Sequence, residues 1–264
     1  MDRFILNYNG NKYRETKKYL TEEIINYDFD YIAEPFGGIF GFSRYYYLLK
    51  KDNKKLKLLI NDIDTDLYLF YNSLKKDFNK TLDNIENEFN KIIKDENITE
   101  DHQLTIFLKK KESYIYNIIK LIGLSVCNCF SISKFRTKLK NFKNKETEYK
   151  NLFKKCTFYN MTSLQFVDKI KHKKKLLIYF DPPYFNSHNL NYHNEFKNKD
   201  YHDGTSIYIE ILNIMKDKNI NSIFVLNKID IINYLFKDFF LKEYTGTYQN
   251  NGKNKKWHII YNNF

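Results

Sequence analysis

The amino-acid sequence predicts an α/β fold built on an open, doubly wound sheet. Three observations predict it. A strand, a glycine-rich turn, a helix and a second strand follow one another between residues 31 and 60. An apolar run typical of a central parallel strand occupies residues 175–180. Each of these two stretches ends in a short polar motif, and sheets of this type bind their ligands at the carboxyl ends of the strands.

The elements expected along the chain divide it into a core and an insert. We expect strands over 31–33, 56–60, 175–180, 222–226, 244–248 and 257–261, and helices over 42–51, 66–78 and 231–239. An Asn-Gly hairpin turn within 249–253 joins the last two strands. The stretch from about 80 to 150 is highly charged and helical in pattern, with one apolar stripe (Ile115, Ile118, Ile119, Ile122) and one candidate strand, 125–130. Residues 1–71 and 151–264 are therefore expected to form the core, and residues 72–150 a helical insert.

Composition narrows the class of protein. The formal net charge is +12, from 44 basic and 32 acidic residues, which favours an anionic partner such as nucleic acid. An AT-rich coding sequence, rich in lysine codons, would raise the charge equally well. No run of 18 apolar residues and no secretory leader occur, and the three cysteines form neither a disulfide framework nor a zinc pair. We expect an intracellular protein without metal.

The glycine-rich turn and the acid that follows the next strand are candidates for a cofactor site. Glycines between a strand and a helix, as in Glu34-Pro35-Phe36-Gly37-Gly38, let the backbone approach a ligand closely. Asp62 ends the next strand, where a carboxylate can accept hydrogen bonds from ribose hydroxyls. An ordinary tight turn, and an Asp62 or Asp64 that caps the next helix, are the alternatives. A strict G-x-G-x-x-G is absent, which argues against a dinucleotide.

The motif Asp181-Pro182-Pro183-Tyr184 is the most specific in the chain. Two prolines rigidify the exit of the strand and fix the directions of the Asp181 carboxylate and the Pro182 carbonyl. Both are hydrogen-bond acceptors, and two acceptors aimed at one point suit an NH₂ group. Tyr184 supplies a flat surface on which the base that carries this group can stack. A plain Asp-Pro turn at the end of a strand is the alternative.

Taken in this order, the three motifs resemble those of the Dam-type (D12 class) DNA adenine-N6 methyltransferases. The resemblance extends to both ends of the chain. Residues 7–12, Asn-Tyr-Asn-Gly-Asn-Lys, resemble the N-terminal motif of that family. Residues 225–227, Val-Leu-Asn, resemble its Ser-Asn strand end, and residues 257–262 resemble its closing strand. The similarity therefore touches the chain from residue 7 to residue 262.

The resemblance implies a Rossmann-like fold for S-adenosylmethionine-dependent methyl transfer, with a mixed seven-stranded sheet and a helical inserted target-recognition domain. It implies a site-specific enzyme that methylates a flipped-out adenine in double-stranded DNA. The catalytic residues implied are Asp181, Pro182, Pro183 and Tyr184. The cofactor-binding residues implied are Tyr8, Asn9, Gly10, Lys12, Glu34, Pro35, Phe36, Gly37, Gly38, Asp62, Ile63, Asn160 and Asp181. The DNA-binding residues implied are Lys134, Arg136 and Lys138.

The sequence departs from the family pattern at a few positions, and other readings stay open. Asn160 stands where the family often has an acid that contacts the adenine of the cofactor, and Ile39 and Phe40 replace small residues of the glycine motif. Residues 128–136 match the recognition element of the family only loosely. An RNA, cytosine-N4 or protein-glutamine methyltransferase, or an inactive nucleic-acid-binding module of the same fold, are the alternatives. The sequence does not specify the target site, the oligomeric state or the biological role, which could be restriction, phage self-marking or regulation.

Overall fold

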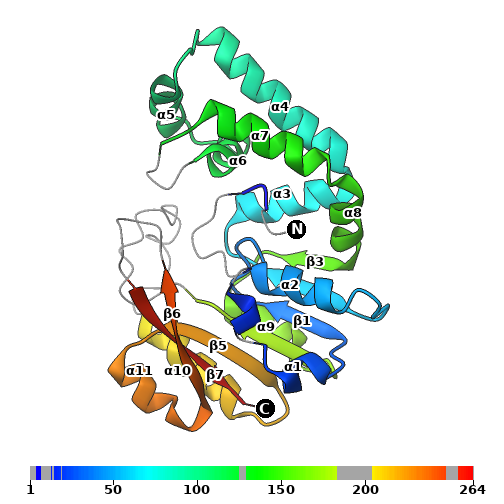
Figure 1. Cartoon of the computed structure of the whole chain (residues 1–264), viewed down its shortest axis with the longest axis vertical. Coiled ribbons are helices and arrows are strands. Elements are labelled where there is room, and N and C mark those ends of the chain that lie inside the picture. Colours follow the sequence, from blue (N-terminus) through cyan, green and yellow to red (C-terminus); the bar gives the residue numbers. More distant parts are fainter. Residues whose placement is uncertain are drawn as a thin grey trace.

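A seven-stranded sheet with the order β3-β2-β1-β4-β5-β7-β6 forms the centre of the molecule (Figure 1). The computed structural model describes residues 4–6, 13, 15–18, 20–124, 129–182, 204–247 and 255–263. The strands are β1 (Tyr31–Glu34), β2 (Lys57–Asn61), β3 (Cys156–Tyr159), β4 (Leu176–Phe180), β5 (Asn221–Asn227), β6 (Phe240–Thr247) and β7 (Lys255–Asn262). The first five pair in parallel, and β7 runs antiparallel to both β5 and β6.

Two hydrophobic clusters cover the two faces of this sheet, and alternate residues of each strand belong to different clusters. Ile32, Leu58, Leu177 and Ile223 belong to the first cluster, and their neighbours Ala33, Leu59, Ile178 and Phe224 belong to the second. On the first face pack α1 (Glu22–Asn26), α2 (Gly41–Leu49) and α3 (Thr65–Lys76). On the second face pack α9 (Ser163–Ile170), α10 (Gly204–Lys216) and α11 (Asp230–Leu235).

Helices connect β2 to β3 and extend away from the sheet to one end of the molecule (Figure 1). They are α4 (Phe78–Asp95), α5 (Asp101–Lys109), α6 (Tyr114–Gly123), α7 (Ile132–Lys143) and α8 (Glu146–Lys155). Their buried side chains continue the first cluster of the sheet. Phe4 joins the two regions, because its ring contacts Phe40 on one side and Phe142 and Tyr149 on the other. Among the described residues, no helix is long and apolar enough to cross a membrane.

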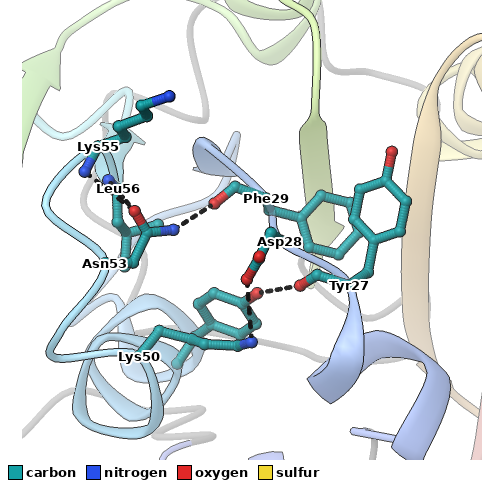
Figure 2. A network of polar contacts seen from close by, with 8 residues as sticks. Tyr27, Asp28, Phe29, Lys50, Asn53, Lys55 and Leu56 are labelled. Atoms are coloured by element: carbon teal, nitrogen blue, oxygen red, sulfur yellow. Dashed lines mark hydrogen bonds and ion pairs between the residues drawn. The ribbon is translucent and has the colours of Figure 1, made fainter.

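Polar contacts fix the amino ends of β1 and β2, which lie opposite the ends that carry the sequence motifs (Figure 2). The Asn53 side chain donates to the Phe29 carbonyl at 3.2 Å and accepts from the backbone amides of Lys55 and Leu56. The Tyr46 hydroxyl donates to the Tyr27 carbonyl at 3.2 Å, which ties α2 to the same loop. These contacts fix the position of β1 along its axis relative to β2, and therefore also the relative positions of their carboxyl ends.

The structure confirms every strand expected from the sequence except 125–130, of which residues 125–128 lie outside the described part. An isolated bridge between Leu124 and Phe130 flanks that stretch. Strand β3 was not predicted from the sequence, because its four residues are too few to show a clear alternation of apolar and polar side chains. The turn at 249–253 also lies outside the described residues, although the antiparallel pairing of β6 with β7 fits a hairpin. The expected divisions at 71–72 and 150–151 fall inside α3 and α8.

Candidate active site at the carboxyl end of the sheet

Four polar side chains end four neighbouring strands on one face of the sheet. Alternate residues of each of these strands belong to the first face: Ile32, Leu58 and Ile60, Leu177 and Tyr179, and Ile223 and Val225. We extend this alternation by two residues along each strand. It brings Asp62 after β2, Glu34 of β1, Asp181 after β4 and Asn227 of β5 to that same face. Because parallel strands present their carboxyl ends at one edge, these side chains form a row in the order Asp62, Glu34, Asp181, Asn227.

Glu34 is almost completely buried, with 3% of its surface exposed. Its Oε1 accepts a hydrogen bond of 2.6 Å from the backbone N–H of Ser43, near the start of α2. Burial is the main reason that the pKa of Glu34 rises to about 8, and the negative charge of Asp181 raises it further. The charge of Asp181 therefore acts on Glu34, as expected of two carboxyls in one site.

The glycine turn needs its glycines for two different steric reasons. Gly38 has a φ of 48°, in the left-handed region that favours glycine. At Gly37 an added Cβ would lie 2.6 Å from the Ile60 side chain and 2.8 Å from the Asn61 carbonyl oxygen. The backbone carbonyl of Asn61 cannot move aside easily, since it also accepts the Gly37 N–H at 2.7 Å. The turn thus packs directly on the end of β2.

Side chains satisfy the remaining polar groups of this turn. Asp62 Oδ2 accepts the Gly38 N–H at 2.7 Å, and the Tyr71 hydroxyl donates to the Gly38 carbonyl at 2.6 Å. Burial raises the pKa of Tyr71 well above its usual value, so its hydroxyl keeps the proton that it donates. The Nε–H of the buried Arg44 donates to the Ile39 carbonyl at 3.1 Å. Since the amides of Gly37 and Gly38 are both occupied, the turn is not built to bind a phosphate group.

The acids after β2 have separate functions. Asp64 caps α3, because its carboxylate accepts the backbone amides of Asp66 and Leu67 at 2.9 and 3.2 Å. Asp62 instead binds the glycine turn: its Oδ1 accepts the Asp64 amide at 2.9 Å, and its Oδ2 accepts the Gly38 amide. Burial raises the pKa of Asp62 to about 6, and these backbone hydrogen bonds limit the rise. Asp62 is therefore predominantly ionised at neutral pH.

Two asparagines join the ends of β2 and β3 and explain one departure from the family pattern. The Asn160 amide group donates to the carbonyls of Asp62 and Ile63 at 2.8 and 3.0 Å. Asn61 is buried, and its amide group donates to the carbonyls of Pro35 and Met161, both at 2.9 Å. An acid at position 160 could not make the donor contacts that Asn160 makes here.

The departures at Ile39 and Phe40 serve the packing of the N-terminal segment. Both side chains are buried, and Phe40 adopts a left-handed φ of 39° directly before α2. The ring centroids of Phe4 and Phe40 lie 5.4 Å apart. The Arg44 guanidinium lies over the Phe4 and Tyr13 rings, 4.8 and 5.0 Å from their centroids. Bulky residues in the glycine motif therefore anchor the segment that leads toward residues 7–12.

The remaining predicted site residues divide into described and undescribed ones. Asp181 is partly exposed and Pro182 is buried at the end of β4. Pro183 and Tyr184, and the predicted cofactor residues Tyr8, Asn9, Gly10 and Lys12, lie outside the described residues. Pro35 is buried, and Phe36 and Ile63 are partly exposed beside the glycine turn and Asp62.

The predicted DNA contacts lie on α7, away from the row of polar side chains (Figure 1). Lys134 and Arg136 are exposed, and Phe135 between them is buried against Phe89 with a ring separation of 4.0 Å. Lys138 differs, because its Nζ donates to the Ile122 carbonyl at 2.8 Å and so connects α7 to α6. The structure thus brings Lys134 and Arg136 to the surface of one helix and uses Lys138 at least partly inside the protein.

Asn61, Tyr71 and Arg44 shape the site but were not among the site residues predicted from the sequence. Asn227 was expected only as part of a strand end that resembles that of the family. Tyr71 and Arg44 lie within helical patterns, where nothing in the spacing distinguishes a hydrogen bond to a turn from ordinary packing. Asn61 could have been suspected, since a polar residue that continues an apolar strand must find hydrogen-bond partners when it is buried. Asn227 ends a strand in the same way.

The mixed seven-stranded sheet with helices on both faces is a Rossmann-like fold, and the row of polar side chains lies at the strand ends where such folds bind their ligands. Among proteins of this fold, the chain belongs to the D12 class N6 adenine-specific DNA methyltransferase family, whose model matches residues 8–250. It is therefore a methyltransferase of the adenine-N6 DNA class, which uses a methyl donor.

The solved structures found to be similar are more distant. They include a human methyltransferase 10 domain containing protein and a delta-N METTL16 MTase domain, with 9% and 12% sequence identity. In both comparisons the TM-score is 0.38, and the alignment covers 96% of this chain and 81% of the other. No curated protein matches the chain.

Proposed function

We propose that this protein transfers a methyl group from S-adenosylmethionine to N6 of a flipped-out adenine at specific sites in double-stranded DNA. The observation that carries the proposal is the row of Asp62, Glu34 and Asp181 on one face, at the carboxyl ends of adjacent strands. Asp62 and Glu34 flank the glycine turn, whereas Asp181 stands at the rigid proline exit on the other side of Glu34. A cofactor half and a substrate half therefore meet between Glu34 and Asp181.

The chemistry of the cofactor half fits S-adenosylmethionine. This cofactor carries a sulfonium, an ammonium group and two ribose hydroxyls but no phosphate, so it needs acceptors and negative charge. The site supplies the Asp62 carboxylate as a negative charge and the Glu34 carboxyl as an acceptor, while the amides of Gly37 and Gly38 are already hydrogen-bonded. Residues that would hold the cofactor are Glu34, Pro35, Phe36, Gly37, Gly38, Asp62, Ile63, Asn160 and Asp181, together with Tyr8, Asn9, Gly10 and Lys12 of the N-terminal motif. When bound, the cofactor supplies an electrophilic methyl group.

Asp181 and the proline pair prepare the amino group for transfer. The lone pair of an aromatic amine is delocalised into the ring, so the nitrogen is a poor nucleophile. Hydrogen bonds from the amino group to the Asp181 carboxylate and the Pro182 carbonyl favour a tetrahedral nitrogen whose lone pair turns toward the cofactor half. Transfer of the methyl group would leave the cofactor as a neutral thioether and the amino nitrogen with a positive charge. The Asp181 carboxylate would then accept the proton that the nitrogen releases. Positioning and hydrogen bonding supply most of the rate enhancement.

Access to N6 requires that the base leave the DNA stack. Tyr184 would stack on the flipped base, and Pro183 would keep Tyr184 at a fixed distance from Asp181. The helices between β2 and β3 would serve as the target-recognition insert. Lys134, Arg136 and Lys138 would contact phosphates there and so position the duplex without reading its sequence.

The test is transfer of labelled methyl from the cofactor to duplex DNA, RNA or protein, followed by nucleoside analysis. We expect label in DNA as N6-methyladenine. Asp181→Ala should reduce turnover at least a thousandfold, by loss of both positioning and proton acceptance, while cofactor affinity stays within a few-fold. Asp168→Ala is the control, since Asp168 is exposed on α9 and forms only a surface ion pair with Lys171. Label in RNA, in protein or on cytosine, or near-normal turnover of Asp181→Ala, would contradict the proposal.

A further inference from the structure

Asn227 is the fourth member of the row of polar side chains, and the proposed function assigns no role to it. It is the last residue of β5, and β5 lies next to β4, on the side away from the cofactor half. In the parallel pairing of the two strands, Phe180 lies opposite Phe224. Continuing this register brings Asp181 level with Val225, so Asn227 stands one pleat repeat beyond Asp181. A side chain in that position borders the substrate half.

The faces of the two strands agree with this position. Val225 belongs to the first hydrophobic cluster and Leu226 to the second, so Asn227 shares the face of Val225. In β4, Tyr179 belongs to the first cluster and Phe180 to the second, so Asp181 lies on the same face as Asn227. The two side chains are therefore diagonal neighbours on one face of adjacent strands, two residues apart in register.

The Asn227 carboxamide has an unused acceptor. Its Oδ1 is buried, and no described residue donates a hydrogen bond to it. A buried carbonyl oxygen without a donor destabilises the folded protein, and such groups are rare unless a ligand supplies the donor. By contrast, the polar groups of the glycine turn described above, at Gly37 and Gly38, are occupied by protein partners. The acceptor without a described donor therefore lies beside Asp181, on the substrate side of the row.

We propose that Asn227 contacts the target base and selects a base that carries an amino group; this inference rests on the proposed function. A carboxamide presents an acceptor and a donor side by side, which matches an amino group beside a ring nitrogen. Oδ1 of Asn227 shares an N6 hydrogen with the Pro182 carbonyl in a three-centre hydrogen bond, while Nδ2 donates to the adjacent ring nitrogen. Guanine and thymine present a carbonyl oxygen at the same position, which would face Oδ1 and be disfavoured.

The test compares the affinity for an unmethylated duplex that the protein methylates with that for the same duplex carrying purine, which lacks the amino group, at the target adenine. The wild-type protein should prefer adenine. Asn227→Leu should lose about tenfold of that preference and about tenfold to a hundredfold in kcat/KM for DNA, with cofactor affinity unchanged. Asn227→Asp should keep more of the preference, because it retains an oxygen acceptor. Asn221→Leu is the matched control, at the opposite end of β5.

The outcomes separate this inference from the proposed function. If the wild-type protein methylates no adenine, the proposed function fails. If it does, and Asn227→Leu keeps the wild-type preference for adenine over purine, the base contact is wrong while the proposed function stands. Should the leucine variant fail to fold, as judged by thermal unfolding, Asn227→Ala gives the same comparison without added bulk.

Discussion

The glycine turn on one side of the site and Asn227 on the other differ in whether their polar groups have protein partners. In the half formed by β1 and β2, protein partners occupy the Gly37 and Gly38 amides and the Gly38 carbonyl. In the half formed by β4 and β5, the buried Oδ1 of Asn227 has no donor among the described residues. The glycine turn of the cofactor half is therefore preformed, whereas in the proposed complex the base would supply the donor that Asn227 lacks among the described residues. Preorganisation of the first half reduces the ordering that cofactor binding requires.

The largest effect on stability is expected from Glu34, the buried carboxyl between the two halves. The pKa of Glu34 is about 8 in the folded protein, against 4.5 ordinarily. Between these values the unfolded chain loses a proton that the folded protein keeps, so stability falls as pH rises from 4.5 to about 8 and levels off above it. The fall is at most about 1.4 kcal/mol per pH unit. Glu34→Gln stays neutral and should flatten it, as measured by urea unfolding at pH 6 and pH 8.

This pH interval isolates Glu34 from its neighbour. Asp62 contributes with the same sign, but its pKa of about 6 restricts that contribution largely to lower pH. Glu23→Gln, on the exposed surface of α1, is the control and should follow the wild-type protein. An equal loss of stability in Glu34→Gln and in the wild-type protein would show that this carboxyl is not held protonated in the fold.

A smaller effect is expected from loosening the preformed half. Tyr71→Phe removes only the hydroxyl that donates to Gly38, a hydrogen bond of about 1 kcal/mol, so cofactor affinity should fall about fivefold. DNA affinity should not change. Tyr68→Phe is the matched control, because Tyr68 lies on the same helix and its hydroxyl has no partner in the described part of the chain. Titration calorimetry checks both; equal cofactor affinity in the two variants would contradict a preformed turn.

The smallest effect per residue is expected from substitutions on α7. They should weaken DNA binding without changing the affinity for the cofactor. Lys134→Ala and Arg136→Ala should each weaken DNA binding a few-fold and reduce the slope of log K against log salt by about 1. Lys138→Ala should change this slope less, because Lys138 already binds the Ile122 carbonyl. Fluorescence anisotropy at several salt concentrations measures it. A cofactor affinity that changed in the first two variants would contradict the separation of the halves.

Much of the site could be predicted from short stretches of sequence. Gly38, Asp62 and Asp181 were predicted because each follows a recognisable strand, and strand ends in a parallel sheet meet at one edge. The sequence also left Asp62 and Asp64 as alternatives for capping α3, and the structure assigns that function to Asp64. Tyr71 and Arg44 could not be predicted, since their hydrogen bonds reach a turn 33 and 5 residues away through the packing of helices.

The sequence by itself determined the order of the strands along the chain, the glycine turn, the acid after β2 and the motif at Asp181, because these depend on local periodicity and backbone conformation. Only the tertiary structure decided the lateral order of the strands and the face that each side chain occupies. Those depend on which strands pair and in what register, and a shift of one residue would turn Asn227 to the opposite face. The neighbourhood of Asn227 and Asp181 is such a pairing, formed by strands more than 40 residues apart along the chain.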